Sequence, residues 1–275
     1  MAVIALSSAK GSPGVSTNAL ALALVWPRPV LLIECDPAGG DILAGYLAGS
    51  DPPGGGLLGL ALLAGRQPLN LTDVWDRALP LDNSRTRHVL PAPADAGQWA
   101  PISDATDHLA EFLVTLTATG TGPDVLLDAG RSGQAGDTRW RGRADLQLVL
   151  LRPSLRGASA ARSHLTGQTG AADAGRVGLI VVGDGPYRAG EIGNALGVSV
   201  FGVIAHDPVA AAVLGGERAA GRGFDRSPLL RSARSLCDGL LPRLTASATR
   251  TEPPVCAPTT NEAIRGAEAK AAPRA

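Results

Sequence analysis

Short runs of apolar residues alternate along this chain with longer segments in which apolar residues recur every three or four positions. The short runs are typical of strands buried in a parallel sheet, and the longer spacing is typical of helices that cover such a sheet. The predicted strands are 2–6, 30–33, 88–90, 124–130, 146–151, 176–182 and 198–204. The predicted helices are 16–26, 57–64, 71–81, 104–117, 155–166, 189–196, 208–220 and 228–244.

This alternation predicts an α/β fold with a doubly wound, mostly parallel sheet flanked by helices. Residues 1–245 are expected to form one domain, which lies within the usual size range for such a sheet. Residues 246–275 are rich in Thr, Pro, Ala and charged residues without periodicity, so they are predicted to be a disordered C-terminal tail.

Composition restricts the picture in three ways. Apolar residues make up 45% of the chain and aromatic residues only 3%, so the core must consist of Leu, Val, Ile and Ala. The formal net charge is zero, so the charge of the whole chain favours no particular partner. Three widely spaced cysteines, the absence of any apolar run of about 18 residues and the absence of a basic N-terminal segment predict a soluble, cytoplasmic protein.

The most informative segment is SAKGSPGVST at 8–17, between the first predicted strand and the first predicted helix. Glycines let such a loop curl so that its backbone N–H groups point at phosphates, which the N-terminus of the next helix also attracts. The pattern GxxxxGK[ST] is not met, because Val15 replaces its lysine and Ala9 its first glycine. The candidate nucleotide-binding residues are Lys10, Gly11, Ser12, Gly14, Val15, Ser16 and Thr17.

Carboxylates follow two of the other predicted strands. The segment LLIECDP at 31–37 contains Glu34 and Asp36, and the segment PDVLLDAG at 123–130 contains Asp128. Parallel strands present their carboxyl ends at one edge of the sheet, where ligands of such sheets bind. These carboxylates are therefore expected beside the phosphate loop.

Together the three motifs resemble those of the ParA/MinD family of P-loop ATPases, whose deviant Walker A loop carries an early lysine, here Lys10. The resemblance covers roughly residues 2–245 and implies that ATP and Mg²⁺ are bound. By the family pattern, Lys10 would contact nucleotide across a homodimer, and Asp36 would orient the attacking water. Ser16 and Asp128 would organise the metal ion. The resemblance also implies a protein partner that stimulates or reads the nucleotide state.

The chain departs from the family pattern at several positions. Val15 removes a positive charge from the phosphates, and Pro13 removes one backbone N–H from the loop. The segments 182–184 and 205–208 replace the family's base-binding motifs. Two functions stay open: a weak ATPase acting as a dimeric switch that positions or regulates a cellular assembly, and a catalytically inactive scaffold. The assembly could be a chromosome or plasmid, a pilus or secretion machine, or another body.

Simpler roles for the same residues also stay open. Ser16 and Thr17 are common at helix N-termini, and Asp36 and Asp128 could be structural residues at strand ends. A run of arginines late in the chain is compatible with nonspecific DNA binding and equally with a solvated helix surface. The arginines of that run are Arg218, Arg222, Arg226, Arg231 and Arg234.

Overall fold

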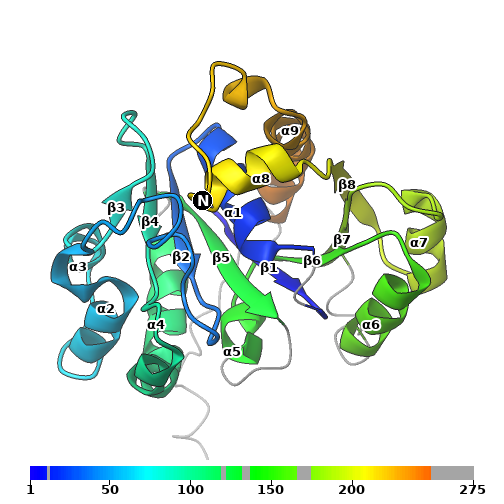
Figure 1. Cartoon of the computed structure of the whole chain (residues 1–275). Helices are drawn as coiled ribbons and strands as arrows, with labels where there is room; N and C mark the ends of the chain where they lie inside the picture. Colours follow the sequence, from blue (N-terminus) through cyan, green and yellow to red (C-terminus); the bar gives the residue numbers. More distant parts are fainter. Residues whose placement is uncertain (11–12, 119–121, 132–136, 166–174, 249–275) are drawn as a thin grey trace, which may run out of the picture.

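The computed structural model describes residues 1–10, 13–118, 122–131, 137–165 and 175–248. In this part of the chain, eight strands form one sheet in the order β3-β4-β2-β5-β1-β6-β7-β8. All neighbouring strands run parallel except β3, which pairs antiparallel with β4 at one edge (Figure 1). The predicted doubly wound sheet is therefore confirmed.

The strands follow the apolar runs closely. Their bounds are β1 Val3–Ser8, β2 Val30–Glu34, β3 Leu79–Pro80, β4 Arg87–Leu90, β5 Asp124–Arg131, β6 Leu146–Leu151, β7 Val177–Val182 and β8 Val200–Ile204. Every residue of β1, β2 and β7 is buried, as expected for strands covered on both faces.

The helices account for most of the remaining described residues. Their bounds are α1 Val15–Val25, α2 Gly56–Ala64, α3 Leu71–Trp75, α4 Ala100–Ala118, α5 Asp137–Gly142, α6 Leu155–Leu165, α7 Ala189–Leu196, α8 Pro208–Leu214 and α9 Pro228–Ala248. Short 3₁₀ turns lie at Pro53–Gly55, Ala96–Trp99 and Phe224–Arg226.

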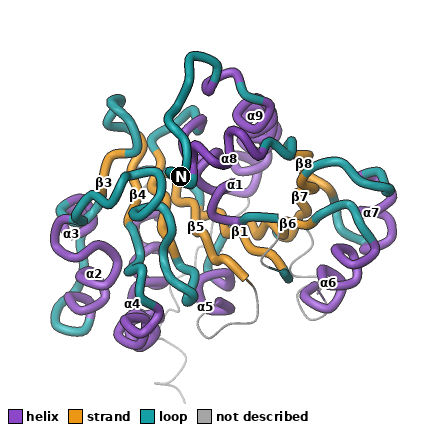
Figure 2. The backbone as a smooth tube through the Cα atoms, in the orientation of Figure 1, coloured by secondary structure: helices purple, strands orange, loops and turns teal. Residues whose placement is uncertain are grey.

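Helices cover both faces of the sheet (Figure 2). On one face α1 packs against α8 and α9, and its residues 19–25 are all apolar because this part of the helix lies between the sheet and these helices. On the other face, α2 and α4 cover one half of the sheet and α6 and α7 cover the other half. The site at the carboxyl ends of the strands is thus held by a rigid, close-packed support.

Several element bounds differ from the sequence-based predictions. The predicted helix 71–81 ends at Trp75, and Leu79–Pro80 forms the antiparallel strand instead. Helix α8 ends at Leu214 rather than at 220, and α5 was not predicted. Helix α9 continues to Ala248, three residues beyond the predicted end of the domain. Residues 249–275 of the predicted tail lie outside the described residues.

The amino edge of the sheet is held by Asp124, the first residue of β5. Its carboxylate accepts hydrogen bonds from the backbone N–H of Ala2 at 2.9 Å and from the indole N–H of Trp26 at 2.8 Å. It also pairs with the guanidinium of Arg28 at 2.7 Å. Asp124 therefore connects β5 to β1 and to the segment between α1 and β2, at the edge opposite the phosphate loop.

Candidate functional site at the carboxyl edge of the sheet

The predicted phosphate loop leads from β1 into α1. Gly14 has a left-handed backbone (φ 83°), which a residue with a side chain rarely adopts, and α1 begins directly after it. The side-chain amide of Asn18 donates to the carbonyl oxygen of Gly14 at 2.7 Å and holds the last turn of the loop against the helix. Gly11 and Ser12 lie outside the described residues.

The side chain of Val15 is buried and is not part of a polar surface. It is 4% exposed and packs into the apolar core that α1 shares with β1 and α9. The side chain at this position therefore adds to the packing of the domain, and the lysine of the standard loop has no equivalent here.

Ser16 and Asp128 lie next to each other. The Ser16 hydroxyl, in the first turn of α1, donates a hydrogen bond to the Asp128 carboxylate near the end of β5. Asp128 is 1% exposed and also accepts the backbone N–H of Gly130 at 3.1 Å. Burial is the largest influence on this carboxyl group and raises its pKa to about 6.

Asp36 is held beside the same strand end. One of its carboxylate oxygens accepts the backbone N–H of Ala38 at 2.9 Å. The other lies so close to Gly130 that a Cβ atom there would be 1.8 Å away, and Gly130 also has a left-handed backbone (φ 54°). The close approach of Asp36 to β5 therefore requires glycine at position 130.

Glu34, the first acid of the segment LLIECDP, holds the following loop. One of its carboxylate oxygens accepts the backbone N–H groups of Asp41 at 2.9 Å and Ile42 at 3.0 Å. The other accepts the N–H of Ala92 at 3.2 Å. Glu34 is 2% exposed, and burial, together with the nearby charge of Asp128, raises its pKa to about 7.

Several acidic groups thus gather around Asp128. The charges of Asp36 and Asp41 both raise the pKa of Asp128, after burial has raised it most. Such a group of oxygens fits Mg²⁺, which takes one or two carboxylates and keeps several waters and phosphate oxygens. Among the described residues, no cluster of three or more His, Cys, Asp or Glu has the arrangement of a metal-binding cage.

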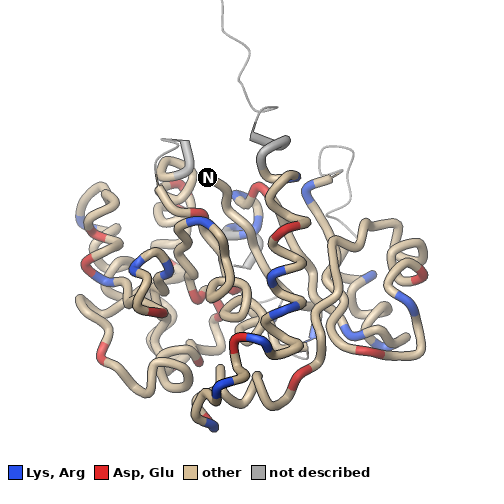
Figure 3. Tube along the Cα trace, turned by 90° about the horizontal axis from the view of Figure 1, so that it is seen from above, with Lys and Arg blue, Asp and Glu red and all other residues tan. Residues whose placement is uncertain are grey.

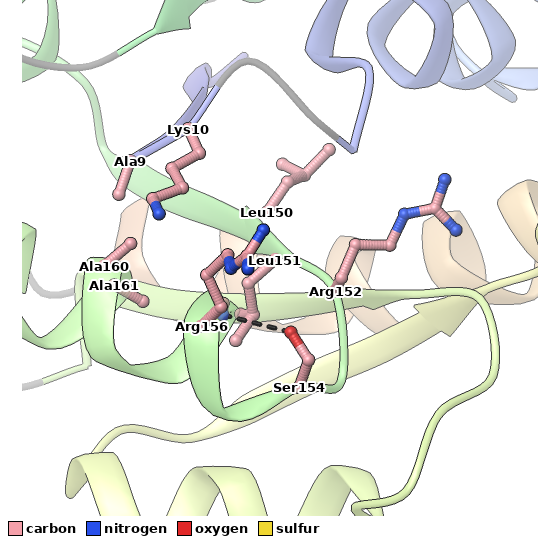
Figure 4. Close-up of a pocket in the computed structure, with 10 residues that line it drawn as sticks. Ala9, Lys10, Leu150, Leu151, Arg152, Ser154, Arg156, Ala160 and Ala161 are labelled. Atoms are coloured by element: carbon pink, nitrogen blue, oxygen red, sulfur yellow. Dashed lines mark hydrogen bonds between the residues drawn. The ribbon is translucent and has the colours of Figure 1, made fainter.

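Two open pockets flank the loop. One, of about 360 Å³, lies between the start of α1, the loop at 41–45 and the end of α8, with Ser16, Thr17, Asp41 and Glu217 in its lining. The other, of about 300 Å³, lies between Ala9–Lys10, the end of β6 and the start of α6, and the Lys10 side chain extends into it (Figure 4). The loop therefore has an acidic side and a basic side.

Comparison with solved structures assigns this architecture. A ParA family ATPase from Chlorobium tepidum superposes with a TM-score of 0.69 at 18% identity, covering 87% of this chain and 98% of its own. The cell division ATPase MinD from Pyrococcus furiosus gives 0.67 at 17% identity, covering 88% and 98%. The septum site-determining protein MinD from Pyrococcus horikoshii, solved with Mg-ADP, gives 0.64 at 17%, covering 87% and 95%.

The chain has the ParA/MinD fold. No protein-family model and no curated protein sequence matches it. No helix in the described part of the chain combines the length and the apolar character needed to cross a membrane.

The family's base-binding motifs are replaced here by the segments 182–184 and 205–208, at the ends of β7 and β8, and the second of these makes contacts within the chain. A guanidinium nitrogen of Arg152, after β6, lies 3.2 Å from Nδ1 of His206, after β8. Asp207 accepts the backbone N–H of Ala210 at 3.0 Å and that of Leu229 at 3.4 Å, and so caps the starts of α8 and α9. Through Asp207, the loop at 205–208 therefore fixes the N-terminal ends of two helices.

The arginines proposed for DNA binding are all exposed, and they extend from the loop after α8 onto α9. Figure 3 shows that acidic residues are interspersed with basic ones on this side of the molecule. The guanidinium of Arg234 donates to the carbonyl oxygen of Asp225 at 2.6 Å, so it also holds the loop before α9.

The structure adds residues that the sequence had not singled out. Asp41 approaches Asp128 because Glu34 binds the backbone of its loop. Arg156 lies beside Lys10 in the basic pocket. A sequence signal for Arg156 exists: it is a cation in the first turn of α6, where a helix favours negative charge.

Proposed function

We propose that this protein binds a Mg²⁺–nucleotide, ATP before others, at the carboxyl edge of its sheet and works as a dimeric switch with weak ATPase activity. The switch would position or regulate a cellular assembly and would be read by a protein partner. Three observations support nucleotide binding. The three motifs resemble those of the family, the fold is shared, and one structural neighbour was solved with Mg-ADP.

The single observation that carries the proposal is the pairing of Ser16 with Asp128 beside Asp36. A hydroxyl at a helix N-terminus, a buried carboxylate and a second carboxylate have converged from three separate segments. A structural cap alone would need neither the buried acid nor the acid beside it. Mg²⁺ would neutralise these charges, and its phosphate ligands would lie at the N-terminus of α1.

Each residue would have a distinct task. Ser16 and Asp128 would hold the Mg²⁺ shell, and Asp36 would orient a water toward the terminal phosphate. The main-chain N–H groups of the loop and the hydroxyl of Thr17 would bind the phosphates, and Lys10 would supply a positive charge. Phosphoryl transfer depends mainly on positioning and charge stabilisation, so the loss of lysine at position 15 predicts slow turnover.

Calorimetry with millimolar MgATP tests the proposal, with Asp128→Asn and Ser16→Ala as variants and Asp145→Asn as the control. Asp145 accepts the N–H of Val3 at 2.8 Å at the opposite edge of the sheet, so its substitution leaves the site intact. Binding that requires Asp128 supports the proposal. Equal heats for Asp128→Asn and wild type, or ATP hydrolysis at a rate unaffected by Lys10→Ala, would contradict it.

The second candidate is a catalytically inactive scaffold, and one observation favours it. Val15 is packed in the core, and Pro13 before it supplies no N–H, so the loop has lost two groups that bind phosphates. A scaffold would give neither heat nor dimerisation with MgATP in the same experiment.

A dimeric switch of this kind implies that a second copy of the chain is a partner. A homodimer would place the Lys10 side of one copy against the other, and MgATP should increase dimerisation in sedimentation experiments. Nonspecific DNA is a further candidate partner through Arg218, Arg222, Arg226, Arg231 and Arg234, all of which are exposed.

A further inference from the structure

We infer that Arg156 is a second phosphate-binding cation, which acts with Lys10 in the basic pocket beside the loop and takes over the charge missing at Val15. The ligand would be a phosphoryl oxyanion. This inference rests on the proposed function for the identity of that ligand as part of a nucleotide.

The two cations share one cavity. The pocket of about 300 Å³ is lined by Lys10 and Arg156, and small residues such as Ala9, Gly157 and Ala160 leave its centre open. In Figure 4 the Lys10 and Arg156 side chains enter this space from opposite sides, one from the end of β1 and one from α6. The pocket volume is large enough for a phosphate group with its first waters.

Among the described residues that line the pocket, none carries a carboxylate. Its third cation, Arg152, contacts His206 and extends away from the centre of the pocket in Figure 4. Within the described part of the chain, neither the Lys10 ammonium nor the Arg156 guanidinium has an ion-pair partner. Two like charges facing one cavity repel each other, and an anion between them would relieve that repulsion.

The helix beneath Arg156 adds to the positive potential. Arg156 is the second residue of α6, and no acidic residue lies in the first turn of this helix. A helix N-terminus carries a partial positive charge, so an arginine there is unfavourable until an anion binds. Ser154 accepts the backbone N–H of Gly157 at 3.1 Å, which fixes the orientation of the first turn toward the pocket.

The pocket lies on the side of the loop that faces β6, whereas Ser16 and Asp128 lie toward β5. An anion held here would therefore be bound on the β6 side of the loop. It could belong to the nucleotide of the same chain or to that of a second copy, and both sources supply the same oxyanion.

The test measures tripolyphosphate binding to the full-length protein by calorimetry, because this probe has phosphates without a base or ribose. Arg156→Gln and Lys10→Gln should each weaken binding at least about tenfold, as expected for the loss of a charge-assisted hydrogen bond. Arg66→Gln is the matched control, since Arg66 is an exposed arginine after α2, at the far side of the sheet. Unchanged affinity in Arg156→Gln, or no binding by the wild type, would overturn the inference.

A parallel titration with MgATP separates this inference from the proposed function. If MgATP binding requires Asp128, and neither MgATP binding nor MgATP-dependent dimerisation requires Arg156, the function stands and the inference fails. If tripolyphosphate binds through Arg156 while MgATP does not bind, the pocket stands and the nucleotide proposal fails. Weaker MgATP binding by monomeric Arg156→Gln assigns the phosphate to the same chain, whereas a loss confined to MgATP-dependent dimerisation assigns it to a second copy.

Discussion

The hydroxyl of Ser16 donates a hydrogen bond to the carboxylate of Asp128, so the first turn of α1 and the end of β5 meet at one point. The two residues are far apart in sequence, and each follows or ends a strand at the centre of the sheet. Strands β1 and β5 pair in parallel with Leu6 opposite Asp128, which sets the height of the acid beside the loop. This register is what turns two separate motifs into one site.

Asp128→Asn should abolish the Mg²⁺-dependent part of nucleotide binding. The amide keeps the shape of the side chain but loses the charge that draws the cation, so affinity for MgATP should fall at least about tenfold. Affinity for ATP measured with EDTA should change less than twofold. Calorimetry with and without Mg²⁺ checks this, and an equal loss under both conditions would point to misfolding instead.

The stability of the free protein should fall as pH rises from about 4.5 to about 7. Burial raises the pKa of Glu34 to about 7 from 4.5, so the folded state retains a proton that the unfolded state has released over this interval. Ionising the group in the fold then costs on the order of 3 kcal/mol, a cost fully present above pH 7.

Denaturant titrations of wild type and Glu34→Gln at pH 5 and pH 7.5 check the pH dependence. The difference in unfolding free energy between the two pH values should shrink in the variant, which has no proton to release at this position. A variant with the same pH dependence as the wild type would assign the effect to other groups.

Gly130→Ala should disturb Asp36 more than it disturbs the backbone. Both Gly130 and Gly197 have left-handed backbones, which cost an alanine about 1 kcal/mol. A Cβ at Gly130 would meet the Asp36 carboxylate at 1.8 Å, whereas nothing lies within 4 Å of a Cβ at Gly197. The melting temperature of Gly130→Ala should therefore lie below that of Gly197→Ala, and any ATPase activity should be lost only in Gly130→Ala.

Val15→Lys should raise the affinity for MgATP about tenfold while lowering stability. Val15 is 4% exposed, so replacing it removes apolar burial worth about 1.5–3 kcal/mol, part of which the lysine stem recovers when its ammonium reaches out to the loop. Calorimetry and thermal unfolding of the variant measure the two effects. A stable variant without a gain in affinity would show that the loop no longer accepts phosphates.

DNA binding, if present, should weaken with salt in proportion to the arginines involved. Removing Arg222 and Arg231, both exposed, should reduce the slope of log affinity against log salt by about 2. An Arg66→Ala, Arg143→Ala double variant carries the same loss of charge at other exposed positions and should keep the full slope. Fluorescence anisotropy with a random duplex provides the measurement.

The sequence by itself determined the alternation of strands and helices, because the runs of Val, Leu and Ile and the helical spacing depend on local pattern alone. It also determined which motifs end the central strands. The bounds were less well predicted where tertiary pairing overrides propensity: Leu79–Pro80 became a strand because it pairs with β4.

Only the tertiary structure decided which of these residues meet. The pairing of Ser16 with Asp128, the clamp of Glu34 on the Asp41 loop and the shared pocket of Lys10 and Arg156 join segments that are distant in sequence. Strand order and register set those distances, and a linear pattern contains neither. The burial of Val15 was likewise decided by the tertiary structure. Whether a side chain faces the core or a ligand depends on what the rest of the fold packs around it.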